Sequence, residues 1–271
     1  MYCFFSDAGY NRAMHTLAIA NHKGGVGKTA TTHALGEILA HEHHLRVLLI
    51  DLDPQSSLTI SCGIDDAAGR CIAEVLGAER PGKTPLTAIV QDLGRGLWLV
   101  PSDLSLGSNA LRMISRVGRE LALARVLPTI ADRFDLAILD CPPNLDVLTQ
   151  NALAAAQGVI VPTQCSKVDL RGVQSLLEAL EQMRVLNPGL RLLGVLPTFF
   201  DARLTYHAQA LEALQHDGVP LLDVRIGRSV RVAEAAAIGT SVVDYTPDNP
   251  QTENYRLLAK VVMKWLKSLP A

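Results

Sequence analysis

The feature that most constrains the fold of this chain is a glycine-rich loop at residues 21–29, which reads Asn-His-Lys-Gly-Gly-Val-Gly-Lys-Thr. The apolar run Leu17–Ala20 precedes it, and a helical pattern begins at Thr29. A strand, a glycine-rich loop and a helix in this order are the usual context of a phosphate-binding loop. Glycines let the backbone curl so that N–H groups point inward at an anion, and the helix N-terminus adds unpaired donors. The loop therefore predicts a mononucleotide site.

The polar side chains of this loop have separate predicted roles. Lys28 can reach the outer phosphates as a point charge, and the hydroxyl of Thr29 is placed to bind Mg²⁺. Lys23 is unusual, because the ordinary pattern has a glycine, four free positions and then Gly-Lys, with no lysine at the front. The predicted phosphate-binding residues are Lys23, Gly24, Gly25, Val26, Gly27, Lys28, Thr29 and Ala30.

Aspartates end two further apolar runs. Asp51 and Asp53 follow a run that ends at Ile50, and Asp140 follows a run that ends at Leu139. In parallel sheets ligands bind at the carboxyl ends of the strands, so these carboxylates are expected to face the glycine-rich loop. A carboxylate beside a triphosphate orients the attacking water or holds Mg²⁺. The three aspartates are therefore candidate catalytic and metal-binding residues.

The order of apolar runs and helical patterns predicts the fold class. Short apolar runs without strict alternation are typical of strands that are buried on both faces. Repeated strand–helix units predict an α/β fold, with a doubly wound, mostly parallel sheet and helices on both faces. The predicted strands are 17–20, 47–50, 97–100, 136–139, 159–161, 192–196 and 221–226, and the predicted helices are 29–41, 108–132, 144–156, 169–186, 203–216, 229–238 and 253–268.

The predicted domain organisation is simple. Residues 14–271 contain no linker or repeat and are interpreted as one domain, within which residues 61–96 form surface loops and short helices. Residues 1–13 are interpreted as a poorly ordered N-terminal extension, since they lack the charged start and long apolar segment of a signal peptide.

Charge and cysteine content restrict the environment and partners. The formal net charge is −2, so any contact with nucleic acid must come from a local basic patch. The five cysteines form no Cys-x-x-Cys pair, which favours a reducing cytosol. No apolar run approaches the roughly 18 residues that a membrane-spanning helix needs. We therefore expect a cytoplasmic protein.

Together these motifs resemble the ParA/MinD family of deviant Walker A P-loop ATPases, and in particular the Soj-like ParA partition proteins. The resemblance rests on the phosphate loop from Lys23, on the strand end Leu48–Gln55 and on Leu139–Pro143. The segments Thr198–Arg203 and Val230–Ala235 are also similar to the family. The resemblance extends over about residues 14–268, with gaps only around residues 61–96.

The resemblance implies a function that depends on two subunits. It implies ATP and Mg²⁺ as ligands and slow ATP hydrolysis by a homodimer that encloses the nucleotides. Lys23 would reach the phosphates of the partner subunit, whereas Lys28 and Thr29 would act within their own subunit. Asp53 would position the hydrolytic water, and two further aspartates would support the metal. These two are Asp51 and Asp140.

The resemblance also implies partners outside the dimer. The dimer would bind nonspecific DNA through Arg203, Arg228 and Arg231 and would associate with the nucleoid. A ParB-like centromere-binding or adaptor protein would stimulate hydrolysis, and the cargo would be a plasmid, a chromosome or another complex.

The residues that would contact the adenine depart from the family. The family usually reads Ile-Pro-Arg-Asn where this chain has Ile-Gly-Arg-Ser at residues 226–229. Gly227 and Ser229 are therefore the candidate base contacts, in a pocket that is expected to be looser than usual.

Two alternative functions follow from the same residues. A MinD-like ATPase could associate with membranes through a basic amphipathic helix, and residues 254–269 have this pattern. We instead expect this helix to pack on the core. A metabolic ATPase could use the same loop to activate a small substrate.

The histidines His41, His43 and His44 suggest a metal site, but a solvated helix terminus is the simpler prediction.

Overall fold

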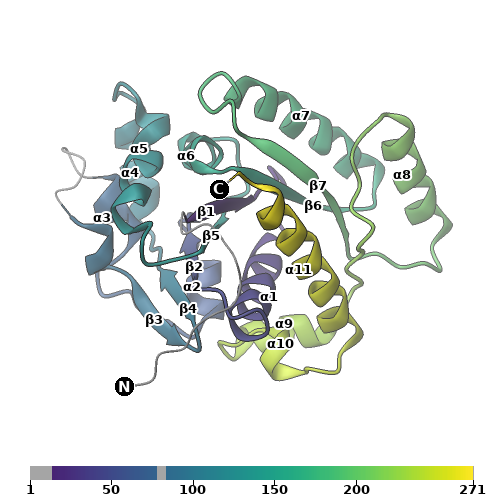
Figure 1. Cartoon of the computed structure of the whole chain (residues 1–271). Helices are drawn as coiled ribbons and strands as arrows, with labels where there is room; N and C mark the ends of the chain where they lie inside the picture. The colour runs from purple at the N-terminus through teal and green to yellow at the C-terminus, as the bar shows by residue number, and fades with distance from the viewer. Residues whose placement is uncertain (1–13, 78–83, 271) are drawn as a thin grey trace.

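The fold is a seven-stranded sheet flanked by helices, as the computed structural model shows for residues 14–77 and 84–270 (Figure 1). The strand order is β3-β4-β2-β5-β1-β6-β7. The pairs are parallel except that β3 runs antiparallel to β4. The strands are β1 (His15–Ile19), β2 (Val47–Asp51), β3 (Gln91–Gly94), β4 (Leu97–Val100), β5 (Leu136–Asp140), β6 (Gly158–Gln164) and β7 (Arg191–Thr198).

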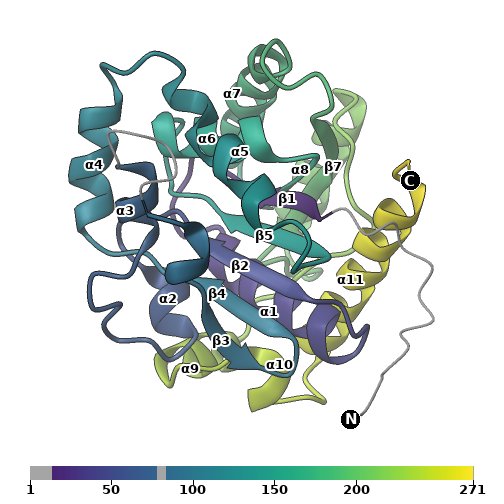
Figure 2. The ribbon, with the colours of Figure 1, turned by 60° about the vertical axis from the view of Figure 1, so that its left-hand side comes forward.

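Helices cover both faces of the sheet, as predicted. Figures 1 and 2 show α1 and α11 on one side and α6 and α7 on the other. The α-helices are α1 (Lys28–His41), α2 (Ser57–Ser61), α3 (Ile72–Leu76), α4 (Ser105–Met113), α5 (Ala122–Val126), α6 (Val147–Ala155), α7 (Lys167–Met183), α8 (Thr205–His216), α9 (Val230–Ala237), α10 (Val242–Tyr245) and α11 (Pro250–Ser268). Short 3₁₀ helices are η1 (Leu86–Ala88), η2 (Arg119–Leu121) and η3 (Leu127–Ile130).

The strands divide the apolar core into two layers. In β1, Ala18 belongs to one buried cluster, and its neighbours Leu17 and Ile19 belong to the other. The same alternation occurs in β5, where Leu139 lies in the first cluster and Ile138 in the second. Successive side chains of a strand point to opposite faces, so an uninterrupted apolar run supplies both layers. This is why the strands of this chain read as continuous apolar runs.

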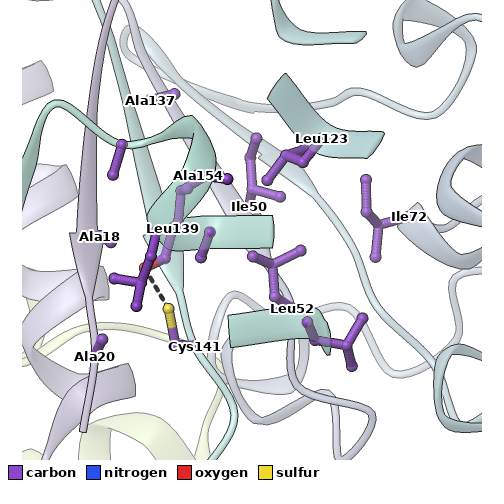
Figure 3. Packing of buried hydrophobic residues seen from close by; sticks show 14 of the residues in the cluster. Ala18, Ala20, Ile50, Leu52, Ile72, Leu123, Ala137, Leu139, Cys141 and Ala154 are labelled. Atoms are coloured by element: carbon purple, nitrogen blue, oxygen red, sulfur yellow. Dashed lines mark hydrogen bonds between the residues drawn. The ribbon is translucent and has the colours of Figure 1, made fainter. Parts of the chain in front are cut away.

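The interpretation of residues 61–96 was only partly correct. The segment contains the short helices α3 and η1, as expected, but it also contributes to the core. Ile72 is fully buried and packs in the same cluster as Ile50 and Leu123 (Figure 3). The sequence does not predict the edge strand β3, because it has only four residues and Leu93 is its one large apolar side chain.

The single helix predicted over residues 108–132 is wrong. The structure has α4, then η2, α5 and η3. α4 ends at Met113, and Gly118, with a φ of 67° in the left-handed region, then breaks the helical course just before η2. Pro128 lies within η3 and has no N–H to continue an α-helical ladder.

The strand predicted over residues 221–226 is also wrong. This segment runs beside β7 and exchanges several backbone hydrogen bonds with it, including Leu222 N–H to Val195 O at 2.9 Å. It forms no regular ladder: one isolated bridge lies at Leu221, and a second lies just after the segment, at Gly227. Pro197 of β7 has no N–H to donate, so a regular ladder cannot form along this edge.

The C-terminal helix α11 packs on the core, as expected. Tyr255, Leu258, Val262 and Trp265 are buried in the cluster that also contains α1. Within the described residues, no helix is long and apolar enough to cross a membrane. The interpretation of residues 1–13 concerns a segment that lies outside the described residues.

Candidate nucleotide-binding site

The glycine-rich loop joins β1 to α1 at the carboxyl edge of the sheet. Gly25 and Gly27 have φ values of 70° and 88°, in the left-handed region that other residues rarely adopt. A Cβ atom added at Gly25 would meet no atom within 4 Å, so the loop is open on that side. α1 begins at Lys28, and no side chain caps its first N–H groups. These donors are therefore available to an anion.

A cavity of about 490 Å³ lies against this loop. It is bounded by residues at or just after the ends of β1, β2, β5 and β7, and by α9. The structure therefore brings together most of the predicted ligand-binding residues. Those that line the cavity are Gly24, Gly25, Gly27, Lys28, Thr29, Ala30, Asp53, Gly227 and Ser229.

Lys28 is held inside the loop. Its side chain is buried, and Nζ donates a hydrogen bond to the backbone oxygen of Lys23 at 2.9 Å. Burial lowers the pKa of Lys28, while the nearby charges of Asp140 and Asp53 oppose this shift. The ammonium group is thus aimed across the glycines, where the outer phosphates of a nucleotide would lie.

Thr29 and Asp140 form the part of the site that fits Mg²⁺. The Thr29 hydroxyl donates to Asp140 Oδ2 at 2.7 Å, and the Thr32 hydroxyl lies 3.3 Å from Asp140 Oδ1. Burial, and then the charge of Asp51, raise the pKa of Asp140. A hydroxyl and a carboxylate are the hard oxygen ligands that Mg²⁺ prefers, and a cation there would favour the charged carboxylate.

Both carboxylate oxygens of Asp51 accept hydrogen bonds from residues behind the site. It is fully buried, and its Oδ1 accepts the N–H of Asp53 at 3.0 Å. Its Oδ2 accepts both the N–H and the hydroxyl of Thr59, at 2.9 Å and 2.7 Å. The Thr59 hydroxyl in turn accepts the N–H of Ser102 at 3.0 Å. Asp51 therefore fastens both ends of the turn that carries Asp53, and its support of a metal stays a prediction.

Replacing Asp51 by alanine should destabilise the protein by about 2–3 kcal/mol, because buried N–H donors lose their acceptor. The urea midpoint of unfolding, measured without nucleotide, checks this. Asp53→Ala is the matched control: Asp53 is half-buried and should change the free energy of unfolding by less than about 1 kcal/mol. Equal midpoints for the two variants would contradict the fastening role.

Asp53 stands at the cavity wall, and its role in orienting water stays a prediction. Its Oδ1 accepts the N–H of Gln55 at 2.9 Å, which closes a tight turn after Pro54. The segment from Pro54 leads directly into α2, and Thr59 of α2 is hydrogen-bonded to Asp51. The position of Asp53 therefore depends on these contacts between α2 and Asp51.

Lys23 lies outside the cavity wall. Its N–H donates to Asn21 Oδ1 at 3.1 Å, and Asn21 Nδ2 donates to Pro162 O at 2.7 Å. Together with the bond from Lys28, these contacts fix the backbone at Lys23, while its side chain is only half-buried. The role of Lys23 in a partner subunit stays a prediction.

On the side of the cavity expected to hold the base, residues that the sequence did not indicate line the wall or support it from behind. Thr198 donates to Val26 O at 2.8 Å and lines the cavity with Phe199. Gln251 of α11 accepts the N–H of Gly227. A Cβ atom at Gly227 would lie only 2.9 Å from this amide, so Gln251 fills space that the missing side chain leaves. Nothing in the local sequence links Gln251 to this position.

The three candidate DNA-binding arginines lie on or near neighbouring loops. Phe200 N–H bonds to Ile226 O at 3.0 Å, which places the loop of Arg203 beside the loop of Arg228. All three arginine side chains are exposed. Arg203 pairs with Asp201 at 2.7 Å, and Arg231 of α9 pairs with Glu234 at 2.8 Å.

Comparisons with known proteins agree with this geometry. A family profile described as "AAA domain" matches residues 14–192. The chromosome-partitioning ATPase Soj of Thermus thermophilus is 41% identical over 250 residues, which cover 91% of this chain and 94% of that protein. The chromosome partitioning protein ParA of Caulobacter vibrioides is 37% identical over 255 residues, which cover 92% and 94%.

A solved structure is similar at both sequence and fold level. It is described as cobyrinic acid a,c-diamide synthase from Mycobacterium smegmatis with bound ADP and magnesium. It shares 36% identity with a TM-score of 0.82, and the match covers 94% of this chain and 96% of that one. This chain and the Mycobacterium smegmatis protein therefore share their fold, and much of their sequence, over most of both chains. The phosphate loop, the Asp53 turn and the Thr29–Asp140 pair lie within this shared fold. This chain belongs to the ParA/MinD family of P-loop ATPases.

Proposed function

We propose that this protein is a ParA-type positioning ATPase that hydrolyses ATP with Mg²⁺, dimerises around ATP and binds nonspecific DNA as a dimer. The proposal of ATP hydrolysis depends on the arrangement of four side chains around the cavity. Lys28, Thr29 and Asp140 meet at the glycine cradle, and Asp53 stands on the wall of the same cavity. Such an arrangement can bind a phosphate chain with Mg²⁺ and orient a water toward it.

Dimerisation would complete the site. Within one subunit the loop supplies Lys28, whereas Lys23 lies outside the cavity wall. A second cation from a partner subunit would neutralise charge on the transferred phosphate, as an arginine finger does in other P-loop enzymes. ATP would then stabilise the dimer, and hydrolysis would release it.

The DNA-binding proposal rests on the exposed arginines beside the cavity. Arg203 and Arg228 come from loops that are hydrogen-bonded to each other, and Arg231 follows at the start of α9. Contacts to phosphates need positive charge without base recognition, which suits nonspecific binding. A net charge of −2 means that this local group must supply the affinity.

The double variant Arg203→Ala/Arg231→Ala should lose ATP-dependent retention on nonspecific duplex DNA. Since each lysine or arginine contact to phosphate adds about one unit to the salt slope, the slope should fall by about 2 per subunit. Retention on immobilised DNA at a series of salt concentrations, with Mg²⁺ and a non-hydrolysable ATP analogue, measures this.

Arg184→Ala is the matched control for this experiment. Arg184 also makes an exposed ion pair three residues away, with Glu181, but follows α7. It should leave the salt slope unchanged. Equal losses in the control and the double variant would reject a local DNA surface, and retention on anionic liposomes instead of DNA would favour the membrane alternative.

A second candidate function is supported by the Mycobacterium smegmatis structure. Its description names a synthase, and the likeness extends over 94% of this chain. The same cavity could then activate a small acid with ATP. ATP turnover that requires cobyrinic acid and ignores DNA would support this function, whereas stimulation by DNA would support the positioning ATPase.

The partner and location follow from the positioning role. We propose a ParB-like adaptor that stimulates hydrolysis, and a cytoplasmic, nucleoid-associated dimer that moves a plasmid, a chromosome or another cargo. Turnover measured with and without the candidate adaptor, in the presence of DNA, tests the first of these.

A further inference from the structure

The C-terminal end of α1 carries His41, for which the sequence predicts a solvated helix terminus. The fold changes this interpretation. Glu37 lies one turn earlier on α1, and Asp244 approaches from α10, more than 200 residues along the chain. His41 is half-buried and Glu37 is buried, so the two are not free surface groups.

The three side chains are close enough to share one ion. One donor atom from each of Glu37, His41 and Asp244 lies within 4.8 Å of the others. Atoms at this spacing share a central point within about 2.8 Å of each, and Zn²⁺ bonds to nitrogen and oxygen ligands are about 2.0–2.2 Å long. Shifts of less than about 1 Å in each donor atom would therefore bring all three within bonding distance of one Zn²⁺ ion.

A second observation points to a ligand. The Nδ1 atom of His41 is inaccessible to solvent and has no hydrogen-bond partner. Buried polar atoms are almost always paired, so an orphan nitrogen on a member of this cluster needs an explanation. A cation bound through the imidazole would give this ring a partner, and it would offset the burial that raises the pKa of Glu37 to about 7.

The surroundings fix one ligand and leave another adjustable. Ser241 donates to Glu37 Oε2, and Glu37 Oε1 lies 3.7 Å from His33 Nε2, so the carboxylate is held from two sides. Such outer contacts orient metal ligands in known sites. Asp244 instead pairs with Arg95 Nη1, at 3.2 Å and 3.1 Å from its two oxygens. The Arg95 side chain is 63% exposed and can move away.

We propose that Glu37, His41 and Asp244 form a binding site for a divalent cation of the zinc class, separate from the Mg²⁺ of the nucleotide site. A set of one imidazole and two carboxylates with a fourth position for water suits Zn²⁺, whereas Mg²⁺ and Ca²⁺ prefer oxygen ligands alone. The ion would tie α1 to α10, whose Val242 also lines the nucleotide cavity.

Titration of untagged, chelator-treated protein with Zn²⁺, in excess Mg²⁺ and without nucleotide, tests the site. Calorimetry should give one ion per chain. His41→Ala and Asp244→Asn should each weaken binding by about tenfold or more. Co²⁺ in place of Zn²⁺ should give visible absorption bands of a four- or five-coordinate ion without a thiolate charge-transfer band. Such a thiolate band would assign the ion to a cysteine and overturn the proposal.

Two further variants separate a metal site from a polar network. Arg95→Ala removes the cation that competes for Asp244, so it should strengthen Zn²⁺ binding several-fold. His43→Ala removes a neighbouring histidine outside the trio and should leave binding unchanged. Equal losses in His41→Ala and His43→Ala, or weaker binding in Arg95→Ala, would overturn the proposal. Circular dichroism of each variant confirms that it is folded.

Discussion

Asp53→Ala should slow ATP turnover by at least about 100-fold, the usual contribution of a group that orients or activates a nucleophile. Nucleotide affinity should change little, because in the proposed site the phosphates and Mg²⁺ would be held by Lys28, Thr29 and Asp140, which meet at the glycine-rich loop. Single-turnover hydrolysis and the binding of a fluorescent ATP analogue measure the two effects separately. The variant should therefore accumulate as the ATP-bound form.

Asp53→Asn is the informative companion, because it keeps the shape and the contact to the N–H of Gln55 while removing the charge. Turnover lost in both variants would assign the effect to the carboxylate charge. Turnover retained by Asp53→Ala would contradict the assignment of Asp53 altogether. Normal turnover with a lowered urea midpoint would show that Asp53 only shapes the turn.

The sequence predicted the centre of the site because its signals are local. The glycines and Lys28 occupy consecutive positions, and their conformation follows from the strand, loop and helix around them. Asp53 and Asp140 end apolar runs, and the parallel topology then places them at one edge. For these residues the order of elements was sufficient.

Other parts depended on contacts between distant segments. Thr59 fastens Asp51 from a helix of five residues that has no clear periodicity. Gln251 reaches Gly227 from α11, and Asp244 reaches Glu37 and His41 from α10. No local pattern specifies such pairs, because each side chain alone is compatible with an exposed position. These contacts could be found only in the folded chain.

The errors in the fold predicted from the sequence have the same origin. Residues 221–226 alternate between buried and exposed positions like a strand, but Pro197 on the neighbouring strand interrupts their pairing. β3 is polar, and it is specified by the tight turn at residues 94–96 and by β4 rather than by its own pattern. Whether these two edge segments form strands depends on their pairing partners rather than on their own strand propensity.

Lys23→Ala should abolish the ATP-dependent dimer while leaving most nucleotide binding intact. The cavity that would hold the phosphates is lined by Lys28 and Thr29 of the same subunit, whereas Lys23 lies outside it. Its loss would therefore remove a contact made only across two subunits. Light scattering with ATP and Mg²⁺, in a background with Asp53→Ala to slow hydrolysis, should show a doubled mass for the parent protein and a monomer for the variant.

Lys28→Ala provides the comparison that makes this test specific. Lys28 is buried beside Asp140, and its removal should weaken nucleotide binding itself by about tenfold or more, since charge-assisted contacts to phosphate contribute about 1.5–3 kcal/mol. Both lysine variants would then be monomeric, but only the Lys23 variant would be monomeric with nucleotide bound. A Lys23→Ala protein that still dimerises with ATP would show that the lysine acts within its own subunit. In that case dimerisation would have to depend on other surfaces of the chain.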